Sequence, residues 1–179
     1  MFKVDKEAER LVKIAKLYKD VMTELGIPET PDNKETPMRV AKALMEMTES
    51  TRKGNEKELI AKCTSFENQS PGIVLEQDGI EFSSMCSHHH LPFIGKVRVT
   101  YIAGEKIIGL SKFNRIVDFF SKKPQVQEDM TMEIGMFLVK QLEPKYLKVE
   151  IYDCLHTCMC ARGVHSRATT KTEFEYKGE

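Results

Sequence analysis

Two groups of cysteines and histidines lie far apart in the sequence. They are residues 86–90, with the sequence CSHHH, and Cys154, His156, Cys158 and Cys160. Zinc binds thiolates and imidazoles tetrahedrally, and a catalytic zinc uses three protein ligands and leaves the fourth position to water. Two segments that meet in the fold could supply such a set. The alternative for the histidine run is a surface accident or an adventitious metal site.

The ligands within residues 86–90 depend on the local backbone. In an extended segment Cys86, His88 and His90 would share a face, whereas in a helical turn Cys86 would face His89. The pattern leaves both arrangements open. The histidine that is not a ligand, together with His156, would be available for proton transfer near neutral pH.

The second group lies in a segment that we expect to be a strand, residues 147–160. Alternation places these side chains on one face: Tyr152, Cys154, His156, Cys158 and Cys160. The other face is apolar and carries Val149, Ile151, Leu155 and Met159. A strand that only packs against a core has no need of stacked thiols, so a ligand or catalytic role is favoured. The isolated Cys63 is expected to be a small buried hydrophobe.

Residues 108–115, with the sequence IGLSKFNR, indicate an anion site. Lys112 and Arg115 lie three residues apart on one face of an expected helix, beside the free amides and positive dipole of its first turn. Phosphate suits these groups, and Arg162 and Arg39 would add planar donors for its oxygens. The alternative is a solvated helix face.

A carboxylate follows in the sequence PQVQE of residues 124–128. Glu128, in the first turn of a helix, would ordinarily be only a partner of the helix dipole. If the ligand is guanine, however, its two adjacent N–H donors match the two oxygens of one carboxylate.

The elements that must position these residues are predicted from hydrophobic spacing. Helices are expected at residues 5–25, 36–47, 111–120 and from 124 onward, where Met130, Ile134, Phe137, Leu138 and Leu142 form an apolar stripe. Thr36 and Ser111 are the expected N-caps. Strands are expected at residues 73–75, 80–83, 96–102, 147–160 and 168–176, and residues 51–72 mostly as connection. Helices grouped among antiparallel strands indicate an α+β domain.

Composition sets the broad class of the protein. The chain has 179 residues, enough for one domain overall, and its 27 basic and 27 acidic residues cancel. No overall field would therefore recruit nucleic acid or an anionic membrane. No apolar run approaches the roughly 20 residues of a membrane span. The first residues lack the apolar core of a secretory signal, so a cytoplasmic location is expected.

Four motifs, in order and spacing, resemble those of the GTP cyclohydrolase I family. They are CSHH at 86–89, GLSK at 109–112 with Arg115, PQVQE at 124–128, and HTC at 156–158 followed by ARG at 161–163. The resemblance implies a tunnelling fold with an antiparallel sheet and helices on one side. It also implies an N-terminal helical region, residues 1–50, before a catalytic region, residues 51–179. Two stacked rings of subunits would form a homodecamer with active sites at subunit interfaces.

The resemblance also implies the roles of individual residues. Cys86, His89 and Cys158 would hold a zinc ion, and His88 and His156 would transfer protons. The residues implied to bind GTP are Gln127 and Glu128 on the guanine edge, Ser111, Lys112, Arg115 and Arg162 on the triphosphate and ribose, and Arg39 from a neighbouring subunit.

The implied reaction opens the guanine imidazole ring of GTP, releases formate and forms 7,8-dihydroneopterin triphosphate. Zinc lowers the pKa of its bound water to about 7, which favours attack on C8. His156 would protonate the ring nitrogen, and His88 with Ser111 would assist the rearrangement of the ribose.

This sequence departs from the family pattern at Ser87, where many members carry Glu, and at His90, where an apolar residue is common. Two alternatives stay open. One is a related tunnelling-fold enzyme that acts on a pterin or a deazaguanine. The other is a non-catalytic, zinc-stapled oligomeric nucleotide-binding module, in which Cys154 or Cys160 would close the metal site as a fourth ligand.

Overall fold

The computed structural model describes residues 5–53, 58–60 and 63–178. The chain divides into two compact units, Met1–Thr48 and Glu49–Glu179, which are described separately. Within the described residues, no helix combines the length and the apolar character that a membrane span requires.

The N-terminal unit is a pair of helices, α1 (Lys6–Glu24) and α2 (Thr36–Met47). Asp5 caps α1 by accepting a hydrogen bond from the amide of Glu7 at 3.0 Å. The two predicted helices are confirmed, but the N-cap predicted at Thr36 lies one residue after the observed N-cap. Glu35 is the N-cap of α2, Thr36 is its first residue, and no side chain caps it.

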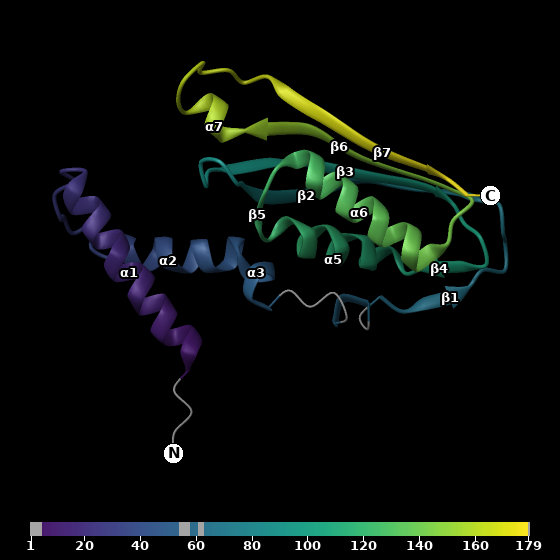
Figure 1. Cartoon of the computed structure of the whole chain (residues 1–179), viewed down its shortest axis with the longest axis horizontal. Helices are drawn as coiled ribbons and strands as arrows, with labels where there is room; N and C mark the ends of the chain where they lie inside the picture. Colours follow the sequence, from purple (N-terminus) through teal and green to yellow (C-terminus); the bar gives the residue numbers. More distant parts are fainter. Residues whose placement is uncertain (1–4, 54–57, 61–62, 179) are drawn as a thin grey trace. The chain divides into compact units, whose positions relative to one another are not determined.

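The second unit is a five-stranded sheet with helices on one side (Figure 1). In sheet order, its strands are β5 (Pro124–Gln125), β2 (Val74–Cys86), β3 (Pro92–Ile102), β6 (Tyr146–His156) and β7 (Thr169–Lys177). All neighbours are antiparallel except the two-residue pairing of β2 with β5. The helices α5 (Leu110–Ser121) and α6 (Gln127–Leu142) cover one face (Figure 1). The predicted α+β class, with helices on one side of an antiparallel sheet, is confirmed.

Smaller elements complete this unit, and some of them differ from the prediction. They are α3 (Glu49–Lys53), the two-stranded sheet of β1 (Ser65–Glu67) and β4 (Lys106–Ile108), and α7 (Thr157–Cys160). The segment expected as mostly connection therefore contains β1. Pro124 opens β5 and not a helix, and α5 begins at Leu110 with Gly109, not Ser111, as its N-cap.

The core lies between the sheet and the two long helices. Val97, Val99 and Tyr101 of β3 are fully buried and belong to one cluster with Ile116 of α5 and Ile134 of α6. The predicted apolar stripe of α6 is confirmed, since all five of its residues are buried. This packing fixes α6 against the sheet and thereby positions its first turn.

Gly135 lets α6 approach β7 closely. A Cβ atom added there would lie 2.2 Å from Cδ1 of Phe174, inside the van der Waals contact distance. We expect Gly135→Ala to lower the free energy of unfolding by about 1–3 kcal/mol through overpacking. The measurement is urea or thermal unfolding. Met132→Ala is the control because Met132 is 53% exposed on the same helix. Equal stability of the two variants would contradict the packing argument.

Two β-bulges decide which side chains face the helices. In β2 the register shifts between Gln77 and Ile80, and Gly79 adopts φ +73°. In β6 the register shifts between Ile151 and Cys154, and Asp153 adopts φ +49°. One extra residue reverses the alternation of side chains. As a consequence, Cys86 at the end of β2 and His156 at the end of β6 face the side of the sheet that the helices cover.

The predicted face of residues 147–160 is therefore wrong. Val149 and Ile151 are buried before the bulge, and Cys154 is fully buried after it, so these three share the helix side. The strand also ends at His156, and Thr157–Cys160 form the helical turn α7. The alternation of side chains with a period of two predicts neither the extra residue of the bulge nor the helical turn.

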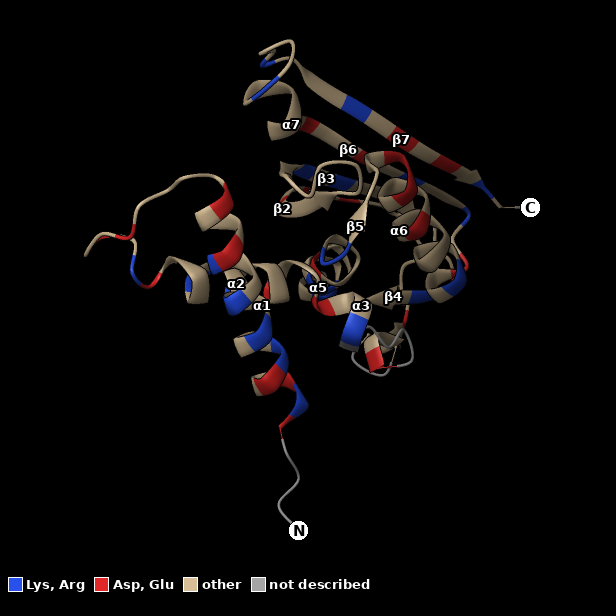
Figure 2. Cartoon of the chain, turned by 60° about the vertical axis from the view of Figure 1, so that its left-hand side comes forward, with Lys and Arg blue, Asp and Glu red and all other residues tan. Residues whose placement is uncertain are grey.

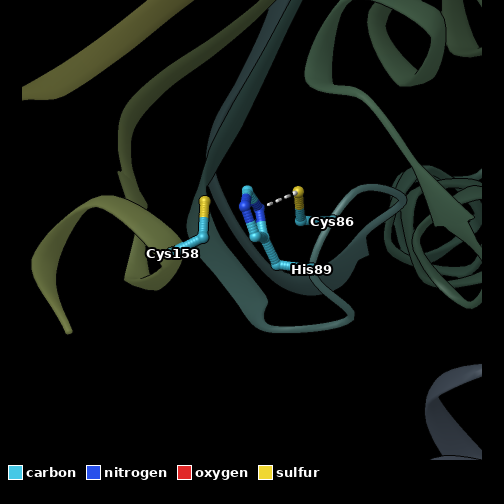
Figure 3. Close-up of side chains that lie close together, drawn as sticks. All are labelled: Cys86, His89 and Cys158. Carbon is cyan, nitrogen blue, oxygen red and sulfur yellow. Dashed lines mark hydrogen bonds between the residues drawn. The ribbon is translucent and has the colours of Figure 1, made fainter. Parts of the chain in front are cut away.

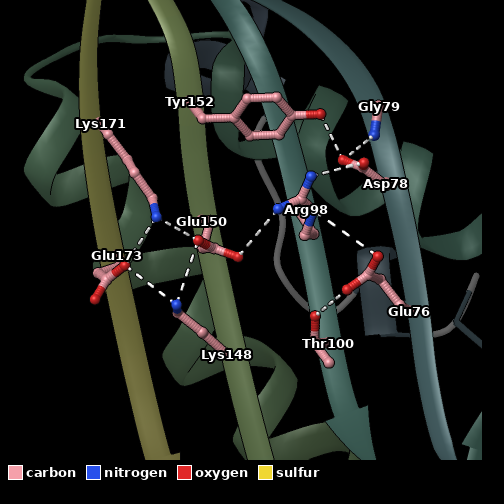
Figure 4. Close-up of polar contacts among 10 residues, drawn as sticks. All are labelled: Glu76, Asp78, Gly79, Arg98, Thr100, Lys148, Glu150, Tyr152, Lys171 and Glu173. Carbon is pink, nitrogen blue, oxygen red and sulfur yellow. Dashed lines mark hydrogen bonds and ion pairs between the residues drawn. The ribbon is translucent and has the colours of Figure 1, made fainter.

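The opposite face of the sheet carries a network of charges (Figure 4). Arg98 donates to Asp78 at 2.9 Å, and Tyr152 also donates to this carboxylate, which together lower the pKa of Asp78 to about 2. Burial alone would raise the pKa of Glu150, but hydrogen bonds from Lys171 and Lys148 outweigh it and lower this pKa. Charges of both signs also occur along α1 and β7 (Figure 2). These surfaces are internally compensated, as the balanced composition suggests.

Candidate active site

Cys86, His89 and Cys158 come together at one end of the sheet (Figure 3). One ligand atom from each residue lies within 4.8 Å of the other two. Cys86 is the last residue of β2, His89 lies in the turn that follows, and Cys158 lies in α7. Two thiols and one imidazole are a donor set that suits a divalent metal such as zinc.

The turn after β2 resolves the choice that the pattern left open. The amide of His90 donates to the carbonyl of Cys86 at 2.9 Å, so residues 87–89 form a turn and not an extended segment. Nδ1 of His88 and Nδ1 of His89 both lie 3.9 Å from Sγ of Cys86. Only His89 belongs to the group with Cys158. His90, exposed at φ +52°, stands outside it.

The helical turn α7 places the second thiol. Oγ1 of Thr157 donates to the carbonyl of Pro92 at 2.5 Å, which ties the start of α7 to β3. Burial raises the pKa of the Cys158 thiol, the adjacent Cys86 raises it further, and Arg162 opposes the shift. Two neighbouring thiolates repel each other unless a cation lies between them. The donor set therefore fits a bound divalent cation.

The other two cysteines near the site are not part of this group within the described residues. Cys154 is fully buried, and burial raises its pKa to about 11, so its thiol stays protonated at neutral pH. Sγ of Cys160 donates to the carbonyl of His156 at 3.3 Å. Cys63 is buried, as predicted.

Arg162 reaches the same group from the loop after α7. Its Nη1 lies 2.7 Å from Nε2 of His89, and a guanidinium can only donate. The structure thus brings Arg162, one of the expected phosphate ligands, into contact with an expected metal ligand.

His156 lies at the end of β6 and is held on two sides. Its ring stacks on Phe93, with centroids 5.0 Å apart and an interplanar angle of 10°. Its Nε2 lies 2.9 Å from Oε1 of Gln127. Burial lowers the pKa of His156, and the negative charge of Glu128 opposes this shift. Glu128 itself is exposed in the first turn of α6.

Gln127 points into the protein. Its side chain is only 2% exposed and bonds to His156, Thr170 and Thr172. The predicted contact between Gln127 and guanine remains a prediction, because in this arrangement the amide is fully engaged with other side chains.

Ser111, Lys112 and Arg115 lie at the start of α5, where Ser111 and Arg115 are exposed. Burial raises the pKa of the Cys63 thiol, and the positive charges of Lys112 and Arg115 oppose this shift. Within the described part of the chain, no hydrogen bond joins these three residues to the Cys86 group. Arg39 lies on α2 of the N-terminal unit. Their roles toward GTP remain predictions.

The sequence reasoning missed Phe93, which stacks on His156, and Thr131, Thr170 and Thr172, which bond to Gln127. Thr170 and Thr172 alternate along a strand beside charged residues, a pattern that is usual for any exposed strand. Only their cross-strand position relative to the bulge in β6 marks them as part of the site.

Comparison with known proteins agrees with the motifs. A profile of the GTP cyclohydrolase I family matches residues 14–179. The protein named GTP cyclohydrolase 1 of Sulfolobus acidocaldarius is 41% identical over 177 residues, covering 95% of this chain and 84% of the relative. Its counterpart in Deinococcus radiodurans is 40% identical over 156 residues, covering 86% and 70%.

A more distant relative belongs to the same family. The protein named GTP cyclohydrolase 1 of Saccharomyces cerevisiae is 35% identical over 167 residues, covering 93% of this chain and 68% of the relative. A solved archaeosine synthase QueF-like enzyme in its apo form has a TM-score of 0.45 and 16% identity, covering 59% of this chain and 95% of that chain. From the profile match and the identity to the three proteins named GTP cyclohydrolase 1, the chain belongs to the GTP cyclohydrolase I family.

Proposed function

We propose that this chain hydrolyses GTP, opening the guanine imidazole ring, releasing formate and forming 7,8-dihydroneopterin triphosphate. Family membership supports this activity, and the curated relatives carry its name over most of the chain. The observation that carries the proposal is the convergence of Cys86, His89 and Cys158 from separate segments, with His156 two residues before one of them.

The metal of this site is proposed to be zinc. Two thiols and one imidazole match its preferences, and a set of three ligands leaves a position open for water. Zinc bound there would supply Lewis-acid activation of water near neutral pH. Because Arg162 lies beside His89, it would reach a substrate bound at the metal.

The chain's own residues would bind and orient the substrate. The exposed Glu128 carboxylate suits the paired N–H donors of guanine. Lys112, Arg115, Arg162 and, from a neighbouring subunit, Arg39 would bind the triphosphate. His156 would move a proton at the ring nitrogen of guanine, and His88 with Ser111 would assist the ribose steps.

The protein is further proposed to be a cytoplasmic homodecamer. Free strand edges support assembly, since β7 closes the described sheet on one side and most of β2 has no partner beyond β5 on the other. Active sites that are completed by Arg39 of a neighbouring copy would require this assembly. Five free cysteines, two of them acting as ligands, suit a reducing compartment.

The reaction is tested by incubating the zinc-loaded protein with GTP. We expect formate to be released and a fluorescent pterin to appear after oxidation of the product. Zinc content and subunit number are measured on the same sample by elemental analysis and light scattering. If neither product appears although zinc is bound, the proposed reaction is wrong, and an enzyme of pterins or deazaguanines would be tested next.

Removing a phosphate ligand should weaken GTP binding more than it slows the reaction. Lys112→Ala and Arg115→Ala each remove one charged contact, for which a loss of about 1.5 kcal/mol or more is expected. The KM for GTP should therefore rise roughly tenfold or more, with a smaller change in kcat. Lys122→Ala, at the other end of α5, is the matched control. If GTP is turned over no better than guanosine, the proposed triphosphate contacts are contradicted.

A further inference from the structure

A closed chain of hydrogen bonds lies behind His156, between α6 and β7. Nε2 of Gln127 donates to Oγ1 of Thr172 at 3.0 Å, and the hydroxyls of Thr172 and Thr131 are 2.6 Å apart. Oγ1 of Thr131 donates to the carbonyl oxygen of Gln127 at 2.8 Å, which returns the chain to its origin. Gln127 and Thr131 are each only 2% exposed, so water cannot replace these partners.

The number of protons fixes the direction of this chain. A hydroxyl has a single proton, and Thr131 uses its proton on the carbonyl of Gln127. Thr172 must therefore donate to Thr131, which leaves a lone pair of Thr172 to accept from the amide NH2 of Gln127. The amide oxygen Oε1 consequently faces the other way, toward Thr170 and His156.

Oε1 of Gln127 can only accept hydrogen bonds, and it has two lone pairs. Thr170 donates to one of them at 2.5 Å, and Nε2 of His156 lies 2.9 Å from the same oxygen. Within the part of the chain that the structure describes, the other polar neighbour of Nε2 is Sγ of Cys154, at 3.7 Å. Nε2 must therefore carry a proton, and among the described residues none hydrogen-bonds Nδ1.

We propose that Gln127, oriented by Thr172 and Thr131, is a positioning residue that holds His156 with its proton on Nε2 and offers only Nδ1 to the substrate. The catalytic role of His156 in this inference rests on the proposed function. The assignment of the proton to Nε2 does not. His156 would meet the substrate through Nδ1, while its Nε2–H stays bonded to Oε1 of Gln127. The stacking on Phe93 fixes the plane of the ring, and the hydrogen bond to Gln127 fixes which edge of the ring faces the amide.

Solid-state NMR of the zinc-loaded protein, with ¹⁵N-labelled histidine, tests the state of the ring without GTP. The measurement is made above the ordinary pKa of histidine, and the signals of His156 are identified by their loss in His156→Gln. We expect a protonated-type signal for Nε2 and a lone-pair-type signal for Nδ1. The reverse pair in the wild-type protein would overturn the proposal, whether or not any variant folds.

Thr172→Val tests the orienting role, because it removes the acceptor that directs the amide NH2 of Gln127 away from His156. The amide can then turn, and we expect a growing fraction of the form protonated at Nδ1. The kcat for GTP should fall roughly tenfold or more, while the KM and the zinc content are retained. Thr100→Val, which removes an exposed hydroxyl that bonds Glu76, is the control.

The two levels of the proposal fail separately. If Thr172→Val keeps the wild-type spectrum, the orienting role of Thr172 is overturned. If GTP gives no formate but His156 is protonated at Nε2, the proposed reaction is wrong and the assignment of the ring stands.

Discussion

Cys158→Ala should lose its zinc and turn GTP over at least about a thousandfold more slowly than the wild-type protein. The variant removes one of the three proposed ligands, and Cys86 with His89 alone would leave two of the four tetrahedral positions without a protein ligand. Water that is no longer activated by the metal is a far weaker nucleophile at neutral pH. The zinc content is measured by elemental analysis, and turnover by the release of formate.

Cys160→Ala is the matched control for this prediction. Cys160 lies in the same helical turn, α7, but its Sγ bonds to the carbonyl of His156, and among the described residues it is not part of the proposed ligand group. We expect this variant to keep its zinc and most of its activity. A Cys158→Ala protein with full zinc, or a Cys160→Ala protein without zinc, would contradict the ligand assignment.

A chelator separates the role of the metal from damage to the fold. Removing zinc from the wild-type protein should abolish turnover while the secondary structure is retained. The core between the sheet, α5 and α6 is built mainly from apolar side chains. Of the proposed ligands, Cys86 belongs to it and Cys158 packs against it. Returning zinc should restore activity to the wild-type protein but not to Cys158→Ala.

The fold was largely predictable from local patterns. The helices α1 and α2, the apolar stripe of α6 and most strand positions follow from hydrophobic spacing, because burial of one face dominates these elements. The errors occur where one residue breaks the period. The bulges at Gly79 and Asp153 add a residue to β2 and β6, and the alternation beyond them is reversed.

The site was only partly predictable, for a different physical reason. The residue types suggested zinc, but the pattern within residues 86–90 fitted both an extended segment and a turn, and the resemblance to a family supplied the turn. Cys158 was expected on a strand and lies on the turn α7, which is what directs it toward Cys86. The threonines behind His156 depend on cross-strand register, and no local pattern encodes that register.

His156→Ala should keep its zinc and its fold but turn over GTP roughly 100 to 10,000 times more slowly, the usual contribution of general acid–base catalysis. The fold should tolerate the change because His156 is only half-buried at the end of β6, and Oε1 of Gln127 keeps the hydrogen bond from Thr170. Loss of the stacking on Phe93 affects one edge of the core. Activity, zinc content and thermal unfolding are measured on the same preparation.

His90→Asn is the control for this variant, since His90 is an exposed histidine at φ +52°, a conformation that asparagine tolerates. We expect it to be as active as the wild-type protein. The mechanism demands that the kcat of His156→Ala falls while its zinc remains, because a proton donor acts on the reacting ring and does not hold the metal. Unchanged turnover in His156→Ala would exclude it as the proton donor, and simultaneous loss of zinc would show that it supports the ligands.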